Sequence, residues 1–174
     1  VSTESGIPDF RSPGGIWDRY PVVYYEEFLR DPEAQRRYWL RSRETYPVLA
    51  RAQPNPAHKA IAALDALGKL LLVVTQNIDG LHQRAGTPPE KVVELHGNNH
   101  WVVCVDCAAR TPREAIQAEL LAGVEVPRCA RCGGLLKNDT VSFGQPLPAE
   151  ALRAAEAAAR TCDLCLVVGS SLVV

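Results

Sequence analysis

Two Cys-x-x-Cys pairs limit what this chain can fold into more than any other feature. The first pair is Cys104 and Cys107, the second is Cys129 and Cys132, and 21 residues lie between the pairs. This spacing is typical of two knuckles whose four thiolates hold a tetrahedral zinc ion. Because four thiolates close the coordination shell, we expect the zinc to hold a small lobe together and to do no chemistry. Two disulfides are the alternative that the spacing leaves open.

A third pair with the same spacing, Cys162 and Cys165, opens an apolar run that we expect to be a strand. Side chains alternate between the faces of a strand, so these two sulfurs would be held apart. The chain also offers no further pair to complete a second zinc site. We therefore predict that both are buried as small hydrophobic residues.

The composition indicates a globular protein with one core and one appended lobe. Hydrophobic residues make up 47% of the 174 residues, and 19 basic side chains face 20 acidic ones. This balance offers no strong positive field for nucleic acid or anionic lipid, and no apolar run is long enough to span a membrane. Six cysteines, four of them at metal-ligand spacing, fit a reducing cytoplasm. The absence of methionine and an end inside an apolar run lead us to expect that both ends are cut.

A strand followed by a polar or Gly-rich turn is expected three times, at residues 70–75, 92–95 and 164–168. Together with helices at 56–67 and 149–160, this order predicts an α/β fold with a Rossmann-like parallel sheet and a small inserted zinc-ribbon lobe. Ligands of such sheets bind beyond the carboxyl ends of the strands, so the three turns should meet at one crevice. We expect the Rossmann-like domain to comprise residues 1–100 and 137–174, the lobe residues 101–136, and a cover segment within the domain residues 12–55. Short helices within 25–51 should break near Asp31-Pro32 and at Pro47.

Polar side chains gather after the first two strands. Gln76, Asn77 and Asp79 follow one strand, and their amide and carboxylate groups suit ribose hydroxyls and a carboxamide. His96 ends the next strand and is followed by Gly97, which permits close approach of a ligand to the backbone. Imidazole titrates near neutral pH, which makes His96 a candidate general base. The alternatives are turn formation by Asn and Asp and a purely structural histidine.

Phe10 and Arg11 lie in the Gly- and Pro-rich first segment, where an arginine could grip phosphate and an aromatic ring could exclude water. An ordinary surface loop is the alternative for this segment.

Taken in order, these pieces resemble the sirtuin family in a bacterial-looking form. The resemblance rests on the motifs STESGIPDFRS (2–12), TQNIDGLHQRAG (75–86), ELHG (94–97), the Cys pairs, FG (143–144) and VVGSSLVV (167–174). It covers essentially the whole chain. It implies an NAD-dependent protein-lysine deacylase, a transferase type of reaction in which the acyl oxygen attacks the nicotinamide ribose. The products would be nicotinamide, O-acyl-ADP-ribose and free lysine.

The resemblance also implies roles for individual residues. His96 would be the general base, and the substrate would be an acyl-lysine protein or peptide. The residues implied in NAD binding are Phe10, Arg11, Gln76, Asn77, Ile78, Asp79, Gly169, Ser170 and Ser171. Those implied in holding the substrate backbone and walling the acyl-lysine are Val141, Phe143 and Gly144, by strand addition.

The chain departs from the family pattern in two places. The Gly-Ala-Gly phosphate loop would precede Val1, so activity is expected of the parent protein rather than of this stretch alone. Residues 137–145 carry Asn, Thr, Ser and Gln where the family usually has Pro, an apolar residue, a large aromatic and Glu. This second departure bears on substrate preference.

Tyr38-x-x-Arg41 resembles the pair with which some sirtuins recognise acidic acyl groups such as succinyl. A solvated helix face is the alternative, and deacetylation remains the default. Two other functions stay open: protein mono-ADP-ribosyl transfer, and a non-enzymatic zinc-ribbon binding module.

Overall fold

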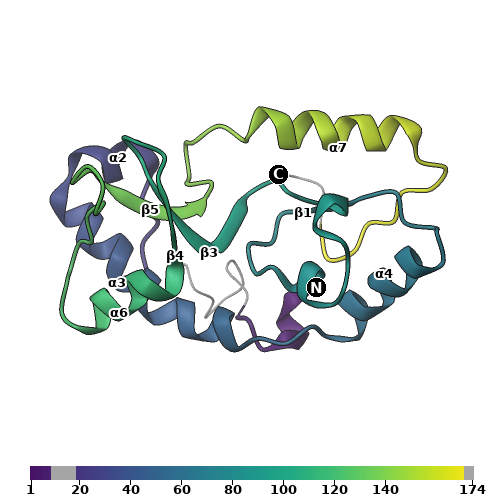
Figure 1. Ribbon diagram of the computed structural model, residues 1–174, viewed down its shortest axis with the longest axis horizontal. Helices are drawn as coiled ribbons and strands as arrows, with labels where there is room; N and C mark the ends of the chain where they lie inside the picture. The colour runs from purple at the N-terminus through teal and green to yellow at the C-terminus, as the bar shows by residue number, and fades with distance from the viewer. Residues whose placement is uncertain (9–18, 171–174) are drawn as a thin grey trace.

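The computed structural model describes residues 1–8 and 19–170 as two groups of elements, with a long helix lying above one of them (Figure 1). The elements, in chain order, are η1 (Ser2–Ser5), α2 (Tyr25–Arg30), α3 (Pro32–Arg51), α4 (Pro56–Ala66), β1 (Val73–Thr75), α5 (Leu81–Arg84), η2 (Pro89–Lys91), β2 (Val92–Glu94), β3 (Gly97–Cys104), β4 (Arg110–Pro112), α6 (Arg113–Leu121), β5 (Leu136–Thr140) and α7 (Ala149–Thr161). None of the described helices combines the length and the apolar character needed to cross a membrane.

The first group is built on a parallel pair of strands. β1 pairs with β2 in parallel, with Val73 opposite Val92 and Thr75 opposite Glu94. The second group is an antiparallel sheet in the order β4-β3-β5. The predicted fold class, a parallel sheet with a small cysteine-bearing lobe, is confirmed.

The expected third strand at 164–168 is wrong for the described structure. These residues carry no strand, and Leu164 and Leu166 are 82% and 72% exposed. A strand needs a neighbour to accept its ladder hydrogen bonds, and none of the described strands pairs with this stretch. The prediction that Cys162 and Cys165 are buried fails with it, since Cys162 is half-buried and Cys165 is exposed.

Helix α3 starts where the sequence predicts but does not break where expected. The Asp31 side chain accepts a hydrogen bond from Glu33 N at 2.8 Å, which caps the helix. Pro47 lies inside α3 and cannot donate to the carbonyl of Arg43, four residues earlier. That carbonyl instead accepts a hydrogen bond from Gln117 Nε2 of α6 at 2.9 Å. A long-range contact thus compensates for the bond that the proline removes.

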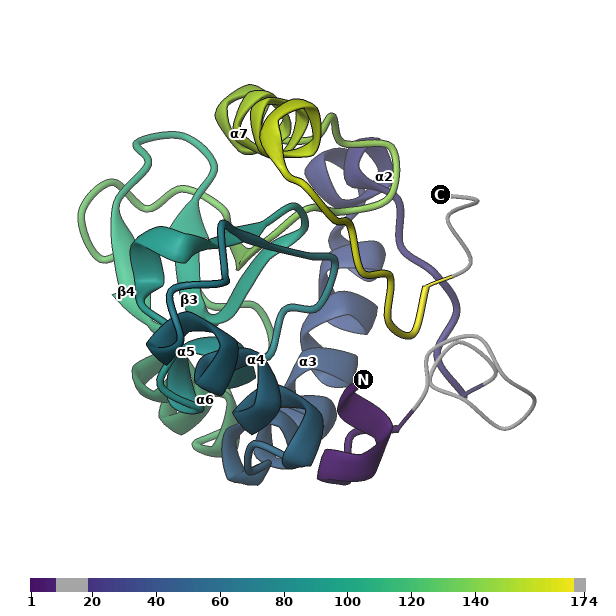
Figure 2. The same cartoon turned by 90° about the vertical axis from the view of Figure 1, so that its right-hand side faces the viewer.

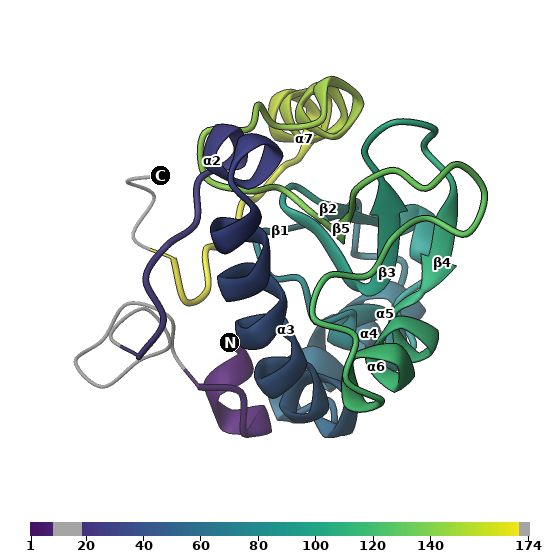
Figure 3. The same ribbon diagram turned by 90° about the vertical axis from the view of Figure 1, so that its left-hand side faces the viewer.

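The main core lies between α3 and the three-stranded sheet, as the side view shows (Figure 3). Its buried members include Trp39 from α3, Val102 from β3, Ile116 from α6 and Leu136 from β5. Helix α3 therefore packs on the cysteine-bearing lobe, although the two are far apart in sequence.

A buried polar network reinforces this packing. Arg113 is fully buried, and its Nη2 donates to the Ser42 carbonyl and hydroxyl oxygens at 3.1 and 3.0 Å. Asn138 of β5 donates from Nδ2 to the same hydroxyl at 2.9 Å. The guanidinium also lies over the ring of Tyr46, with Cζ 4.5 Å from the centroid. These contacts tie α3, α6 and β5 together.

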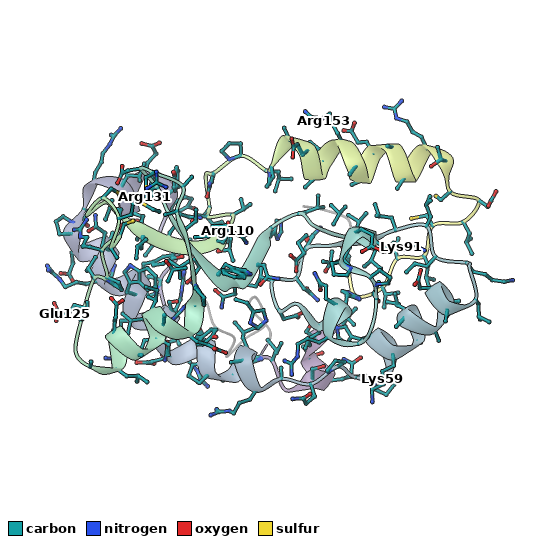
Figure 4. All side chains as sticks on the ribbon, in the orientation of Figure 1. Lys59, Lys91, Arg110, Glu125, Arg131 and Arg153 are labelled. Atoms are coloured by element: carbon teal, nitrogen blue, oxygen red, sulfur yellow. The ribbon has the colours of Figure 1, made fainter. Side chains whose placement is uncertain are left out.

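Helix α7 runs above the group that contains β1 and β2, and it has no buried residue (Figures 1 and 2). On the outer side of the small sheet, Arg110 of β4 pairs with Asp139 at 2.6 Å, and its Cζ lies 4.9 Å from the ring centroid of Trp101. Figure 4 shows Arg110 among these strands, whereas Glu125 and Arg131 lie at the far end of the lobe.

Candidate active site and zinc centre

The polar loop after β1 lies alongside the chain that follows β2. Leu95 N donates to Thr75 O at 2.9 Å, and Asn99 N donates to Ile78 O at 2.9 Å. Gln76, Asn77 and Ile78 are half-buried, and Asp79 is buried. The structure therefore brings together the two strand ends that the sequence singled out.

His96 lies against this loop in a defined orientation. Its Nδ1 is 2.9 Å from the carbonyl oxygen of Gln76. A carbonyl can only accept, so Nδ1 carries the hydrogen and a neutral imidazole keeps its lone pair on Nε2. The contact selects the tautomer in which Nε2 can act as a base.

Ser2 connects the N-terminal segment to the loop. Its hydroxyl lies 2.5 Å from Asp79 Oδ2 and accepts a hydrogen bond from Asn77 Nδ2 at 2.8 Å. Asp79 Oδ1 accepts from Leu81 N at 2.9 Å. Our reading of the residues gave Ser2 no role of its own, because its partners are more than seventy positions away in the sequence.

Two other histidines lie beneath the loop. His58 and His82 are buried, with ring centroids 4.9 Å apart. Burial lowers the pKa of both imidazoles, so each favours its neutral form at neutral pH. We assign them to packing.

The segment expected to bind substrate starts beside the histidine. Val141 N donates to His96 O at 2.8 Å. Farther along, Phe143 is 41% exposed and forms a parallel bridge with Tyr24, and its carbonyl accepts from Tyr25 N at 2.8 Å. Gly144 is exposed next to them. The contact with Tyr24 and Tyr25 was not predicted, since these residues lie at the start of α2 and carry no motif.

Tyr38 and Arg41 lie elsewhere. Tyr38 is buried in the main core, and its hydroxyl accepts a hydrogen bond from Asn138 N at 3.0 Å. Arg41 is half-buried, with its Cζ 5.3 Å from the centre of the Tyr38 ring. Tyr38 therefore lies in the core, and it is neither on a solvated helix face nor beside the polar loop.

The remaining candidates lie at the chain ends. Gly169 lies directly against Val1, because a Cβ there would come within 2.8 Å of the Val1 nitrogen. Ser170 is exposed. Three predicted cofactor residues, Phe10, Arg11 and Ser171, lie outside the described residues.

The four predicted zinc ligands form one cluster. The Sγ atoms of Cys104, Cys107, Cys129 and Cys132 all lie within 4.8 Å of one another. Sγ of Cys104 is 3.5 Å from that of Cys132, and Sγ of Cys107 is 3.7 Å from that of Cys129. Tetrahedral zinc with bonds of about 2.3 Å needs sulfur separations of about 3.8 Å, so the cluster fits the ion. The structure thus places the four predicted cysteines in position to bind a zinc ion, and a closed set of four thiolates suits a structural ion.

Gly97 holds His96 close to β5 in a way that no other residue can. Its φ is +75°, and a Cβ would overlap the backbone carbonyl oxygen of Asp139. We predict that Gly97→Ala lowers the free energy of unfolding by about 1 to 2 kcal/mol from the backbone conformation and by about 1 to 3 kcal/mol more from overpacking. Urea denaturation measures the loss.

Gly68→Ala is the matched control for this change. Gly68 has a φ of +67° but nothing within 4 Å of its Cβ position, so it should show the backbone part alone. Equal losses in the two variants would contradict the close approach of Gly97 to Asp139.

Lys137 predicts a pH dependence of stability. Its Nζ is buried and donates to the carbonyl oxygens of Asn138 and Thr140 at 3.0 and 2.5 Å. Burial lowers the pKa of this amine from 10.5 to about 8. Between these two values the unfolded chain binds more protons than the folded one, so the free energy of unfolding should rise from pH 8 to pH 10.5. Lys137→Met should remove this part of the rise in urea denaturation curves, and an unchanged slope would contradict the shifted pKa.

The fold and the site together define an α/β protein with two features: a lobe that carries a cluster of four cysteines, and a polar loop that is bonded to a histidine. A family model described as the Sir2 family matches residues 1–174. The chain belongs to the Sir2 family.

Its relatives include named enzymes of bacteria and archaea. The chain is 45% identical over 172 residues to the NAD-dependent protein deacetylase of Thermodesulfovibrio yellowstonii, covering 99% of this chain and 66% of the relative. It is 46% identical over 176 residues to NAD-dependent protein deacetylase 2 of Streptomyces coelicolor, covering 99% and 72%. With NAD-dependent protein deacylase 2 of Pyrobaculum aerophilum the identity is 46% over 177 residues, covering 100% and 67%. The chain thus spans about two thirds of the length of these relatives.

Solved structures agree with this placement. A Sir2 protein with a p53 peptide and NAD+ superposes with a TM-score of 0.86 at 39% identity, covering all of this chain and 68% of the other. A Sir2 protein bound to a propionylated peptide gives a TM-score of 0.86 at 38% identity, with the same coverage.

Proposed function

We propose that the intact protein removes acetyl or other acyl groups from protein lysines with consumption of NAD and one water, releasing free lysine, nicotinamide and an O-acyl-ADP-ribose. The observation that carries the proposal is the position of His96 between the two parts of the site. Its imidazole is bonded to the polar loop through Gln76 O, and its backbone carbonyl is bonded to Val141 N at the start of the substrate segment. The names of the deacetylase and deacylase relatives support the same activity.

In this proposal each group of residues has a separate role in binding, proton transfer or folding. NAD supplies the electrophilic ribose carbon when it is bound. Nε2 of His96 takes a proton from a ribose hydroxyl, since Nδ1 is already occupied by Gln76 O. Asn77 and Gln76 orient the ribose, and Asp79 with the Ile78 backbone receives the carboxamide. Phe10, Arg11, Gly169, Ser170 and Ser171 complete the cofactor contacts, whereas the zinc site keeps the lobe folded.

We propose acetyl as the default acyl group. Tyr38 lies in the core with its hydroxyl bonded to Asn138 N, which supports a structural role rather than contact with an acidic acyl chain. Val141, Phe143 and Gly144 are proposed to hold the substrate backbone by strand addition. The division into the NAD domain, the lobe 101–136 and the cover segment 12–55 is retained as a proposal. A cytoplasmic location is proposed because reduced thiolates suit that compartment.

The test uses the intact protein with NAD and acetyl-lysine peptides. Nicotinamide release should require both, and mass spectrometry should find the acetyl group on ADP-ribose and a free lysine on the peptide. ADP-ribose retained on protein would instead support mono-ADP-ribosyl transfer. Peptide affinity without any nicotinamide release would support a binding module. A panel of acetyl, propionyl and succinyl peptides then measures the acyl preference.

A further inference from the structure

The backbone carbonyl of Asp79 has a partner outside the motifs that carry the family resemblance. Nε2 of His100, in β3, lies 2.8 Å from Asp79 O. As with His96, a carbonyl accepts only, so Nε2 carries the hydrogen in either the neutral or the charged imidazole. The bond therefore forms in both protonation states of His100.

A break in strand pairing turns His100 toward the loop. Gly97 pairs with Thr140 and Val102 pairs with Asn138, so five residue steps on β3 lie opposite two on β5. Such a bulge frees residues from the ladder and re-aims their side chains. Between these two pairs, Asn99 N reaches Ile78 O and the His100 ring reaches Asp79 O.

Gly80 makes room for the His100 ring. Its φ is +66°, and a Cβ there would lie 3.1 Å from His100 Cδ2 and 3.2 Å from Nε2. The imidazole therefore lies directly on the peptide that joins Asp79 to Gly80. The backbone of His100 is itself fixed, because His100 N donates to Asn98 Oδ1 at 2.8 Å, and Asn98 Nδ2 donates to Glu94 Oε1 at 2.7 Å.

The two ends of Asp79 are thus held separately. Its carboxylate is held by Ser2 and Leu81 N, and its carbonyl is held by His100. We propose that His100 is a positioning residue that fixes the Asp79-Gly80 peptide, and with it the end of the loop that receives the carboxamide of NAD. This inference rests on the proposed function for the role of Asp79 but not for the contact itself.

Three substitutions at one position test the inference in the intact protein. His100→Gln places an amide N–H close to where Nε2 lies, His100→Asn places it short of that point, and His100→Phe keeps a ring without a donor. Hydrogen exchange of the Leu81 amide, which is bonded to Asp79 Oδ1, reports the order of the loop without requiring turnover. Steady-state kinetics report KM for NAD and kcat separately.

We expect exchange at Leu81 and KM for NAD to rise about fivefold in His100→Phe and His100→Asn, the size expected from one hydrogen bond. Both should stay within about twofold of the parent in His100→Gln, with kcat changing less than KM in every variant. Equal exchange in the Phe and Gln variants would overturn the inference. If the parent protein releases no nicotinamide, the proposed function fails, and the exchange pattern alone then decides whether His100 holds the loop.

Discussion

Substitution of His96 by alanine should lower nicotinamide release by about 10²- to 10⁴-fold, the range that general base catalysis contributes. The physical reason is the tautomer selected by Gln76 O, which leaves Nε2 as the acceptor for a ribose proton. The effect should fall on kcat, because alanine leaves the loop contacts of Asp79 and Asn77 with Ser2 in place. The measurement is nicotinamide formed per enzyme with saturating NAD and acetyl-lysine peptide.

The control for this prediction is Lys59→Ala, an exposed position on α4 that Figure 4 shows away from the strands. It should retain the parent rate. The His96 variant must also retain its zinc and its unfolding midpoint, so that lost activity reports chemistry. Unchanged turnover in His96→Ala would show that the proposed mechanism is wrong.

Loss of a zinc ligand should have the largest effect on folding. Zinc binding in small thiolate sites is worth on the order of 10 kcal/mol, and much of it is folding free energy. Cys104 and Cys129 are buried within the main core cluster, so the ion and the core support each other. We expect Cys129→Ser, or a strong chelator, to remove the metal and raise hydrogen exchange throughout residues 101–136.

Cys165→Ser is the matched control, because it belongs to a Cys pair of identical spacing but is exposed and outside the cluster. It should keep one zinc ion per chain by elemental analysis and show parent-like exchange. A parent protein that holds no metal, or that stays fully folded after chelation, would contradict the zinc assignment.

Features that depend on neighbouring residues could be predicted from the sequence. Helix α4 begins at Pro56 because the Asn55 side chain accepts a hydrogen bond from Ala57 N at 3.0 Å. This cap can be predicted from the adjacent residues Asn55 and Pro56 alone. The thiolate cluster is similar, since each Cys-x-x-Cys places two sulfurs on one turn. The meeting of Gln76 with His96 followed from the rule that neighbouring parallel strands end at the same edge.

Features that depend on partners distant in the sequence could not be predicted from the sequence. In the continuous helix α3, Gln117 bonds the carbonyl of Arg43 that Pro47 leaves without a helical donor, and Asn138 bonds the hydroxyl of the buried Tyr38. Neither partner is visible in the local sequence pattern. The apolar run at 164–168 has strand character, but strand formation is decided by a pairing partner and not by composition. His100 was missed because its role arises from a bulge, which has no sequence signature here.

The network of Arg113, Ser42 and Asn138 has a mechanical consequence. Because the network binds α3 to the lobe, α3 and the lobe would move as one body relative to β1 and β2. Helix α3 belongs to this body although it precedes β1 and β2 in the sequence. The described chain crosses between the two bodies at residues 52–55, 95–97 and 141–148. Hinge rotation would be absorbed at these crossings, and two of them contain His96 and Val141. Because Val141 N is bonded to His96 O at 2.8 Å, rotation at these crossings would move His96 and Val141 together.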